Sequence, residues 1–180
     1  MSRVYTVGHS TRELGELIEV LTAHGVELLV DVRRFPGSRR HPHFDRERLE
    51  AALPENGIGY LWLGEALGGR RSGRKDTPHR AWTVKGFAAY ADHLETDEFK
   101  RAAGELAARA RERRTAFMCA EIRWVSCHRR LIADWLTVRG WEVVHLVDAR
   151  HTEEHRLPHF ARVEGDRLIY DGGQLELPVD

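Results

Sequence analysis

The feature that most constrains the fold is a strand–helix–strand pattern in the first 32 residues. Residues 4–7 form an apolar run that predicts a strand, and apolar residues recur at helical spacing over residues 14–21 before Gly25. Residues 28–32 then predict a second, buried strand, with Asp31 near its end. A strand–helix–strand crossover of this length joins two parallel strands, and the crossover is right-handed. The pattern therefore predicts a parallel sheet with a helix against one face.

The remaining chain continues the alternation of strands and helices. Further strands are expected at residues 59–63, 115–120 and 142–147, and helices at 45–53, within 82–94, at 97–112, and from Ser126 or Cys127 to Gly140. Residues 167–170 and 174–177 flank Asp171-Gly172-Gly173, which is a hairpin signal. We expect one α/β domain over residues 1–180, with an open, mostly parallel sheet, helices on both faces and a short C-terminal hairpin.

Composition narrows the class of protein. Charged residues make up 31% of the 180 residues and hydrophobic residues 42%, which is typical of a soluble globular protein. No apolar run approaches the roughly 20 residues of a membrane span, and the first residues lack a signal-peptide pattern. We expect a cytoplasmic protein that does not bind membranes. The formal charge is zero, which argues against a broad nucleic-acid surface but permits a local basic patch.

Residues 117–130, between a predicted strand and a predicted helix, contain several side chains that could take part in catalysis. This segment contains the only two cysteines, Cys119 and Cys127, together with Glu121 and a basic cluster. Two cysteines eight positions apart do not resemble a secreted disulfide framework, so reduced thiols are expected. A helix start after a strand presents backbone N–H groups to an anion, at the sheet edge where ligands usually bind.

Two loops carry most of the remaining basic residues of interest. Residues 33–44, broken by proline and glycine, contain four arginines and two histidines interleaved with Phe35 and Phe44. This loop follows a strand, so it predicts a clamp for a phosphate or a base, although a solvated charged loop has the same composition. The glycine-rich residues 64–75 predict a mobile basic loop that could act as a lid.

The start of the first predicted helix also carries a local signal, because Ser10 and Glu13 have the spacing of a capping box.

Four ordered blocks of sequence resemble one family. They are Thr6-Val-Gly-His-Ser-Thr-Arg12, Asp31-Val-Arg-Arg-Phe-Pro-Gly-Ser38, residues 60–69 with their Leu-Gly pairs, and Met118-Cys-Ala-Glu121 followed by Cys127-His-Arg129. Together they resemble the domain of unknown function 488 family. The resemblance implies an α/β fold with an open parallel sheet and a link to the removal of damaged pyrimidine bases from DNA. The family usually has an acidic, proline-containing loop between its cysteines, whereas residues 122–126 here are basic and aromatic.

A looser similarity connects the chain to rhodaneses and the related cysteine phosphatases. Residues 29–33 resemble the strand before their substrate loop, and a strand ending in Cys119 before a helix resembles their active-site cradle. The phosphatase arrangement needs an arginine six positions after the cysteine. That position is Val125 for Cys119 and Ala133 for Cys127, so the similarity extends to the fold and not to catalytic identity.

The leading hypothesis is a hydrolase that acts on a nucleic acid or a phosphorylated small molecule, and the family resemblance makes a glycosylase for damaged pyrimidines its specific form. Cleavage of an N-glycosidic bond needs a carboxylate to activate water or stabilise the sugar cation, and donors to hold the leaving base. The expected catalytic residues are Glu121, Asp31, His9, Cys127 and His128. The expected substrate-binding residues are Ser10, Arg33, Arg34, Phe35, Arg129 and Trp124. An imine-forming mechanism would instead use Lys85.

Other classes of function remain open at this stage. Cys119 or Cys127 could be the nucleophile of a sulfurtransferase or phosphatase, and the chain could also be a noncatalytic nucleotide-sensing module. A metal site could combine both cysteines with His128 and His9, but their spacing is not that of a zinc knuckle. His151 and His155 lie four apart, as a metal pair on a helix would, or as ordinary surface histidines. We expect no metal and no cofactor.

Overall fold

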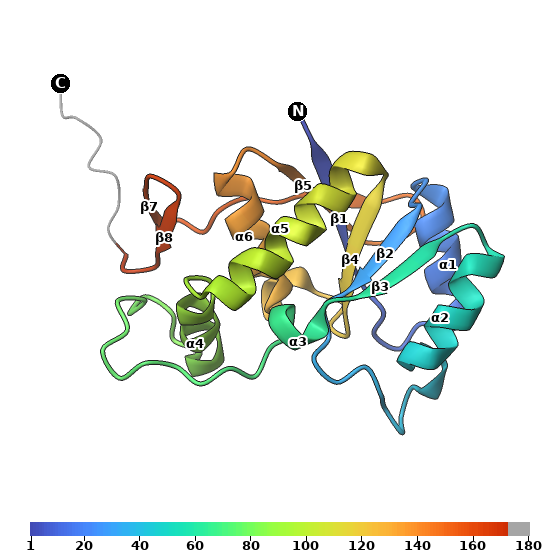
Figure 1. Ribbon diagram of the computed structural model, residues 1–180, viewed down its shortest axis with the longest axis horizontal. Helices are drawn as coiled ribbons and strands as arrows, with labels where there is room; N and C mark the ends of the chain where they lie inside the picture. The colour runs from blue at the N-terminus through green and yellow to red at the C-terminus, as the bar shows by residue number, and fades with distance from the viewer. Residues whose placement is uncertain (173–180) are drawn as a thin grey trace.

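A central sheet of six strands organises the computed structural model, which describes residues 1–172 (Figure 1). The strand order is β3-β2-β4-β1-β5-β6, and every neighbouring pair is parallel except β5 with β6. The strands are β1 (Arg3–Gly8), β2 (Leu28–Asp31), β3 (Gly59–Trp62), β4 (Thr115–Cys119), β5 (Glu142–Leu146) and β6 (Thr152–Glu154). The predicted open, mostly parallel α/β sheet is thereby confirmed.

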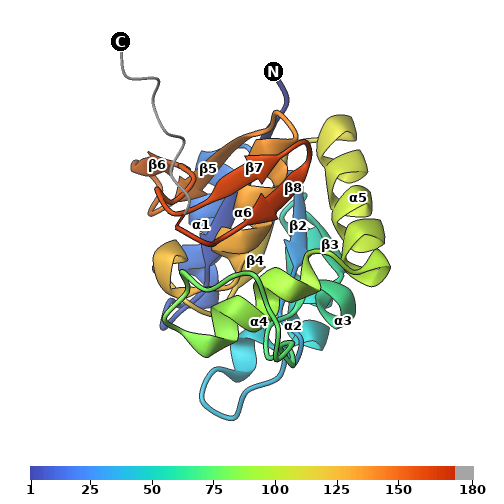
Figure 2. The same cartoon turned by 90° about the vertical axis from the view of Figure 1, so that its left-hand side faces the viewer.

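Helices cover both faces of this sheet, as expected. Figures 1 and 2 show α1 and α2 on one face and α4, α5 and α6 on the other. The helices are α1 (Leu14–Ala23), α2 (Arg46–Glu55), α3 (Gly64–Leu67), α4 (Lys85–His93), α5 (Asp97–Glu112) and α6 (Arg129–Val138), with 3-10 turns η1 (Pro42–Phe44) and η2 (Trp124–Ser126). The short α3 lies inside the segment that was expected to be a basic loop.

Alternation along β1 explains the two-sided core. Tyr5 and Val7 belong to the cluster that packs with α1 and α2, whereas Val4 belongs to the cluster that packs with α4, α5 and α6. Successive side chains of a strand point to opposite faces, so a strand buried on both sides is apolar at almost every position. The continuous apolar runs in the sequence follow from this burial.

Two predicted helix starts were wrong. Ser10 and Glu13 do not form a capping box: α1 begins at Leu14 without a side-chain cap bond, and Ser10 has a φ of 45°. The Ser10 N–H donates to the Ala120 carbonyl at 2.8 Å, so this residue joins the ends of β1 and β4. The helix expected from Ser126 or Cys127 is preceded by η2, and α6 itself begins at Arg129.

The C-terminal hairpin is present, but its arms differ from the prediction. β7 (Arg162–Glu164) pairs antiparallel with β8 (Arg167–Ile169), and residues 174–177 of the predicted second arm lie outside the described residues. Figure 2 shows this hairpin in front of α6. His151 and His155 are not on a helix, because β6 runs between them along the sheet edge. The helical pairing of these two histidines is therefore wrong, and the alternative of surface histidines holds for His151 but not for His155, which is buried.

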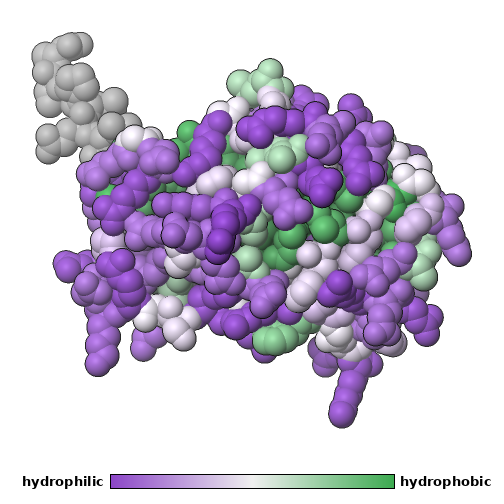
Figure 3. All heavy atoms as spheres, in the orientation of Figure 1, coloured by the Kyte–Doolittle hydropathy of each residue, from purple (hydrophilic) through white to green (hydrophobic). Residues whose placement is uncertain are grey.

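The molecular surface on the face of Figure 3 is mainly hydrophilic, with small hydrophobic areas between the polar groups. Within residues 1–172, no helix is both long enough and apolar enough to cross a membrane.

Candidate functional site

A cavity of about 510 Å³ opens at the carboxyl ends of the central strands. Four parts of the chain line it: the loop after β2, the loop after α3, the connection from β4 to α6, and the first turns of α4 with Val84 before them. The lining side chains used below are Arg33, Arg34, Phe35, Arg70, Val84, Phe87, Tyr90, Cys119, Glu121, Cys127 and His128. This position is the usual ligand crevice of a parallel sheet. We call it the main cavity.

Asp31 fixes the position of Arg33 beside the main cavity. Its Oδ1 accepts from the Arg33 Nε at 2.9 Å, and its Oδ2 accepts from an Arg33 terminal nitrogen at 2.8 Å and from the Tyr60 hydroxyl. The same guanidinium donates to the Phe44 carbonyl at 2.6 Å. Asp31 is 0% exposed and Arg33 is 8% exposed. A bidentate pair of this kind holds the guanidinium plane rigidly.

His9 continues this network as a neutral ring. Its Nδ1 lies 3.0 Å from the Ser10 carbonyl and its Nε2 lies 3.2 Å from an Arg33 nitrogen. Arginine can only donate, so Nε2 accepts and Nδ1 carries the proton. Burial lowers the pKa of His9 to about 4. The ring also stacks on Phe44, with centroids 4.3 Å apart. His9 therefore supports Arg33 and does not line the main cavity.

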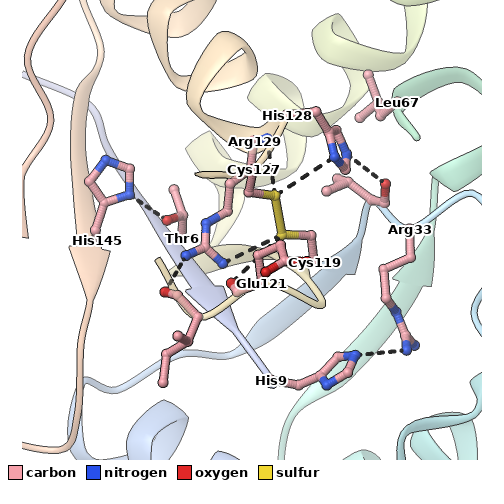
Figure 4. Close-up of a disulfide and its surroundings, with 12 residues drawn as sticks. Thr6, His9, Arg33, Leu67, Cys119, Glu121, Cys127, His128, Arg129 and His145 are labelled. Atoms are coloured by element: carbon pink, nitrogen blue, oxygen red, sulfur yellow. Dashed lines mark hydrogen bonds between the residues drawn. A yellow bond between two sulfur atoms is a disulfide. The ribbon is translucent and has the colours of Figure 1, made fainter. Parts of the chain in front are cut away.

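The two cysteines meet at the floor of the main cavity (Figure 4). Cys119 ends β4, Cys127 precedes α6, and a disulfide joins them with Cα atoms 7.6 Å apart. The expectation of reduced thiols is therefore wrong for this structure. The two cysteines meet because the connection from β4 to α6 returns over the carboxyl end of β4.

Arg129 lies beneath the cysteine pair. One terminal nitrogen lies 3.6 Å from the Cys119 sulfur and the other donates to the Ile122 carbonyl at 2.9 Å. The Arg129 backbone N–H points at the Cys127 sulfur, 3.5 Å away. Burial lowers the pKa of Arg129 to about 10, and the charge of Glu121 opposes that effect. With 1% exposure, this guanidinium holds the loop and the sulfurs in place.

His128 faces the same pair from the other side. Its Nε2 lies 3.2 Å from the Val32 carbonyl, an acceptor, so this nitrogen carries the proton. Its Nδ1 lies 3.7 Å from the Cys127 sulfur. Burial lowers the pKa of His128 to about 4. The unprotonated Nδ1 is thus placed to accept a hydrogen bond from a Cys127 thiol when the disulfide is reduced.

Glu121 is the exposed carboxylate of the main cavity. It lies two residues after the end of β4, and its backbone packs tightly on β1, where a Cβ on Gly8 would lie 1.9 Å from the Glu121 carbonyl oxygen. Only a residue without a side chain permits this approach. The Gly8 position therefore sets where the Glu121 segment crosses the cavity floor.

The rim of the main cavity combines an exposed aromatic ring with positive charge. Phe35 is 64% exposed. The Arg34 and Arg70 guanidinium carbons lie 5.5 and 5.9 Å from its ring centroid. Arg34 also donates to the Arg70 carbonyl at 2.8 Å, which ties the loop after β2 to the loop after α3. The rim thus presents a stacking surface between two cations.

The structure brings together six of the eleven candidate residues from the sequence. Glu121, Cys127, His128, Arg33, Arg34 and Phe35 line the main cavity. The other five support it or lie elsewhere. His9, Asp31, Ser10 and Arg129 pack behind the cavity wall, as described above. Trp124 stacks on His145, with centroids 4.3 Å apart, and donates from its indole nitrogen to Glu153 at 2.8 Å, so it lies toward β5 and β6.

Sequence reasoning missed the wall supplied by α4 and the residue before it. Val84, Phe87 and Tyr90 line the main cavity, although residues 82–94 were predicted only to contain a helix. Tyr90 is 1% exposed, whereas Val84 is 53% exposed. The periodicity of the sequence did not distinguish these two environments.

Metal-binding geometry is not found within residues 1–172, where no group of three or more histidine, cysteine or acidic side chains could hold an ion. His9 in particular points to Arg33 and not to the cysteines (Figure 4). Lys85 lies outside the main cavity and lines a neighbouring one.

Comparison with known proteins gives one match. No curated protein and no solved structure matches the chain significantly. One family profile, described as domain of unknown function DUF488, matches residues 13–136, which include Asp31, the loop after β2, the cysteine pair and the start of α6. The chain therefore belongs to the DUF488 family.

Proposed function

We propose that the chain is a hydrolase that cleaves the N-glycosidic bond of a damaged pyrimidine nucleotide in a nucleic acid. The observation that supports this proposal most is that Glu121 and Phe35 line the same open cavity. A carboxylate beside the sugar can activate water or stabilise the sugar cation, and an aromatic face can hold a base that has left its stack. A cavity of about 510 Å³ falls in the range of small-molecule sites.

Positive charge around the cavity favours a phosphorylated substrate. Arg34 and Arg70 flank Phe35, and a second cavity of about 660 Å³ adjoins the first at Gly86. Its cationic lining residues are Arg71, Arg74, Lys75 and Lys85. Phosphate contacts position a nucleic acid without reading its sequence. The zero net charge of the whole chain thus coexists with a local basic surface.

An incision assay tests this proposal directly. Wild type and Glu121→Gln are incubated with labelled oligonucleotides that each carry one damaged pyrimidine, and alkali then reveals abasic sites. We expect wild type to excise at least one lesion and Glu121→Gln to lose about 100-fold or more in rate. Glu47→Gln, on the exposed surface of α2, is the matched control and should retain wild-type activity. Absence of excision by folded wild type across the lesion set contradicts the proposal.

A second candidate is cysteine-dependent transfer, favoured by the surroundings of Cys127. Once the disulfide is reduced, His128 Nδ1 can accept a hydrogen bond from the Cys127 thiol, and the Arg129 N–H can donate to the thiolate that forms when this thiol loses its proton to solvent. With thiosulfate, this thiolate would take the outer sulfur as a persulfide and release sulfite, and an acceptor thiolate or cyanide would then remove that sulfur.

Thiosulfate and phosphate-ester substrates test the second candidate in the presence of a reductant. Turnover that requires reduction, is lost in Cys127→Ser and persists in Glu121→Gln would favour cysteine chemistry. Turnover that survives in Cys127→Ser would exclude it.

A further inference from the structure

A third cavity, of about 540 Å³, adjoins the main cavity. The two cavities share Val84, Phe87 and Ser126 as a common wall. Trp82, Arg130 and Phe160 are the other large side chains in its lining, so we call it the aromatic cavity. None of these three residues belongs to the proposed reaction.

Aromatic rings form a preorganised surface in this cavity. The Trp82 ring packs against Phe87 and Phe160, with centroids 5.1 and 4.9 Å apart and nearly perpendicular planes. Tyr170 supports Trp82 from below, with its centroid 5.2 Å away. Edge-to-face packing fixes the rings, so binding of a flat ligand costs little side-chain entropy. Such a surface fits a nucleobase, because every base has a face that can stack.

Arg130 adds a cation at the same place. Its guanidinium carbon lies 4.8 Å from the Trp82 centroid and 5.7 Å from the Trp124 centroid. The group donates to the Val125 carbonyl at 3.1 Å, and within residues 1–172 it has no carboxylate partner. Its Nε and the indole nitrogen of Trp82 are buried and lack hydrogen-bond partners among the described residues. A cation held without an anion beside two aromatic rings suits a phosphate that carries a base.

We propose that the aromatic cavity binds the nucleotide next to the target nucleotide, so that the substrate is a single strand of at least two nucleotides. This inference rests on the proposed function, which places the target in the main cavity. The neighbouring base stacks in the aromatic cavity, and the phosphate between the two nucleotides passes the Ser126 wall within reach of Arg130. Stacking and charge do not distinguish bases, so this position contributes affinity and not sequence preference.

Calorimetric titration of Glu121→Gln with thymidine 5′-monophosphate and with the dinucleotide pTpT tests the inference without any turnover. We expect pTpT to bind about tenfold more tightly or better, because its second base gains a stacking contact that the mononucleotide lacks. Adding Arg130→Gln or Phe160→Leu should reduce this preference toward unity and leave mononucleotide affinity unchanged. The two substitutions act on charge and on stacking, so a folding defect in one leaves the other informative.

Arg139→Gln is the matched control, because Arg139 also covers a tryptophan, with its guanidinium carbon 3.6 Å from the Trp135 centroid. It lies at the opposite end of α6, and its substitution should keep the dinucleotide preference. Equal affinity for the two ligands, binding of neither, or equal weakening of both by Arg130→Gln would overturn the inference. A preference for the dinucleotide without excision of any lesion would support the binding site in the aromatic cavity and contradict the proposed glycosylase activity.

Discussion

Asp31 is the last residue of β2 and Glu121 lies two residues after the end of β4, and the surroundings of the two carboxylates differ. Both oxygens of the buried Asp31 accept hydrogen bonds, two of them from the Arg33 side chain. Glu121 is exposed in the main cavity. A carboxylate that is fully paired is not free to activate water, so the geometry favours Asp31 as a positioning residue and Glu121 as the reacting carboxylate.

Replacing Asp31 should therefore reduce stability as well as activity. Asp31→Ala leaves the Arg33 guanidinium buried beside the neutral His9 without its counterion. We expect a loss of about 3–5 kcal/mol in the free energy of unfolding, measured by urea denaturation. Glu50→Ala removes an exposed arginine partner on α2 and should cost less than about 1 kcal/mol. Equal effects of the two substitutions would argue against a rigid Asp31–Arg33 pair.

At the scale of elements, close contact between β1 and the segment after β4 determines the cavity floor. Gly8→Ala would place a Cβ 1.9 Å from the Glu121 carbonyl oxygen and 2.8 Å from an Arg129 nitrogen. Because a backbone atom cannot move aside like a side-chain end, the Glu121 segment must shift.

We expect Gly8→Ala to lower the free energy of unfolding by about 1–3 kcal/mol and to impair excision even where the protein is folded. Gly104→Ala on α5 meets no atom within 4 Å and should stabilise the protein by about 0.5–1 kcal/mol. Thermal denaturation compares the two variants. A neutral Gly8→Ala would show that the Glu121 segment is not held by this contact.

Prediction from sequence succeeded for elements whose signal is burial. The apolar runs located β2 and β4 to within one residue, and α5 matched its expected range because its apolar stripe and its Thr96 cap agree. It failed where a tertiary contact replaced a local one. Ser10 has a capping sequence, but its backbone bonds to Ala120 instead. Propensity describes only the local alternative, and the contact between β1 and β4 is stronger here.

The location of the candidate site could be predicted from the sequence, but the directions of its side chains could not. Parallel strands bring their carboxyl ends together, so residues directly after β2 and β4 had to converge. The directions of individual side chains depend on packing that sequence does not reveal. Trp124 lies against His145 for this reason. The wall from α4 comes from a helix whose position over the sheet depends on the long connection of residues 68–84.

At the scale of the whole molecule, several histidines are kept neutral by burial. Burial lowers the pKa of His9 and His128 to about 4 and that of His145 to about 2, and it also lowers the pKa of His79 and His93. His145 belongs to a buried chain in which its ring bonds Thr6 at 2.6 Å and His155 at 2.9 Å, and His155 bonds Asp134 at 2.6 Å. Protonation of these rings in the folded state would cost the contacts that hold them.

Stability should therefore fall as the pH decreases from about 7 to 5.5. In the unfolded chain each histidine titrates near pH 6.5, so below that value the unfolded state takes up protons that the folded state refuses. Each such histidine lowers the free energy of unfolding by up to about 1.4 kcal/mol per pH unit, above the range where carboxylates titrate. Urea denaturation at several pH values should show this slope, and His9→Gln should reduce it by the share of one proton. If the free energy of unfolding stays constant over this range, the buried rings accept protons in the folded state. The assignment of His9 as a neutral ring that supports Arg33 would then be wrong.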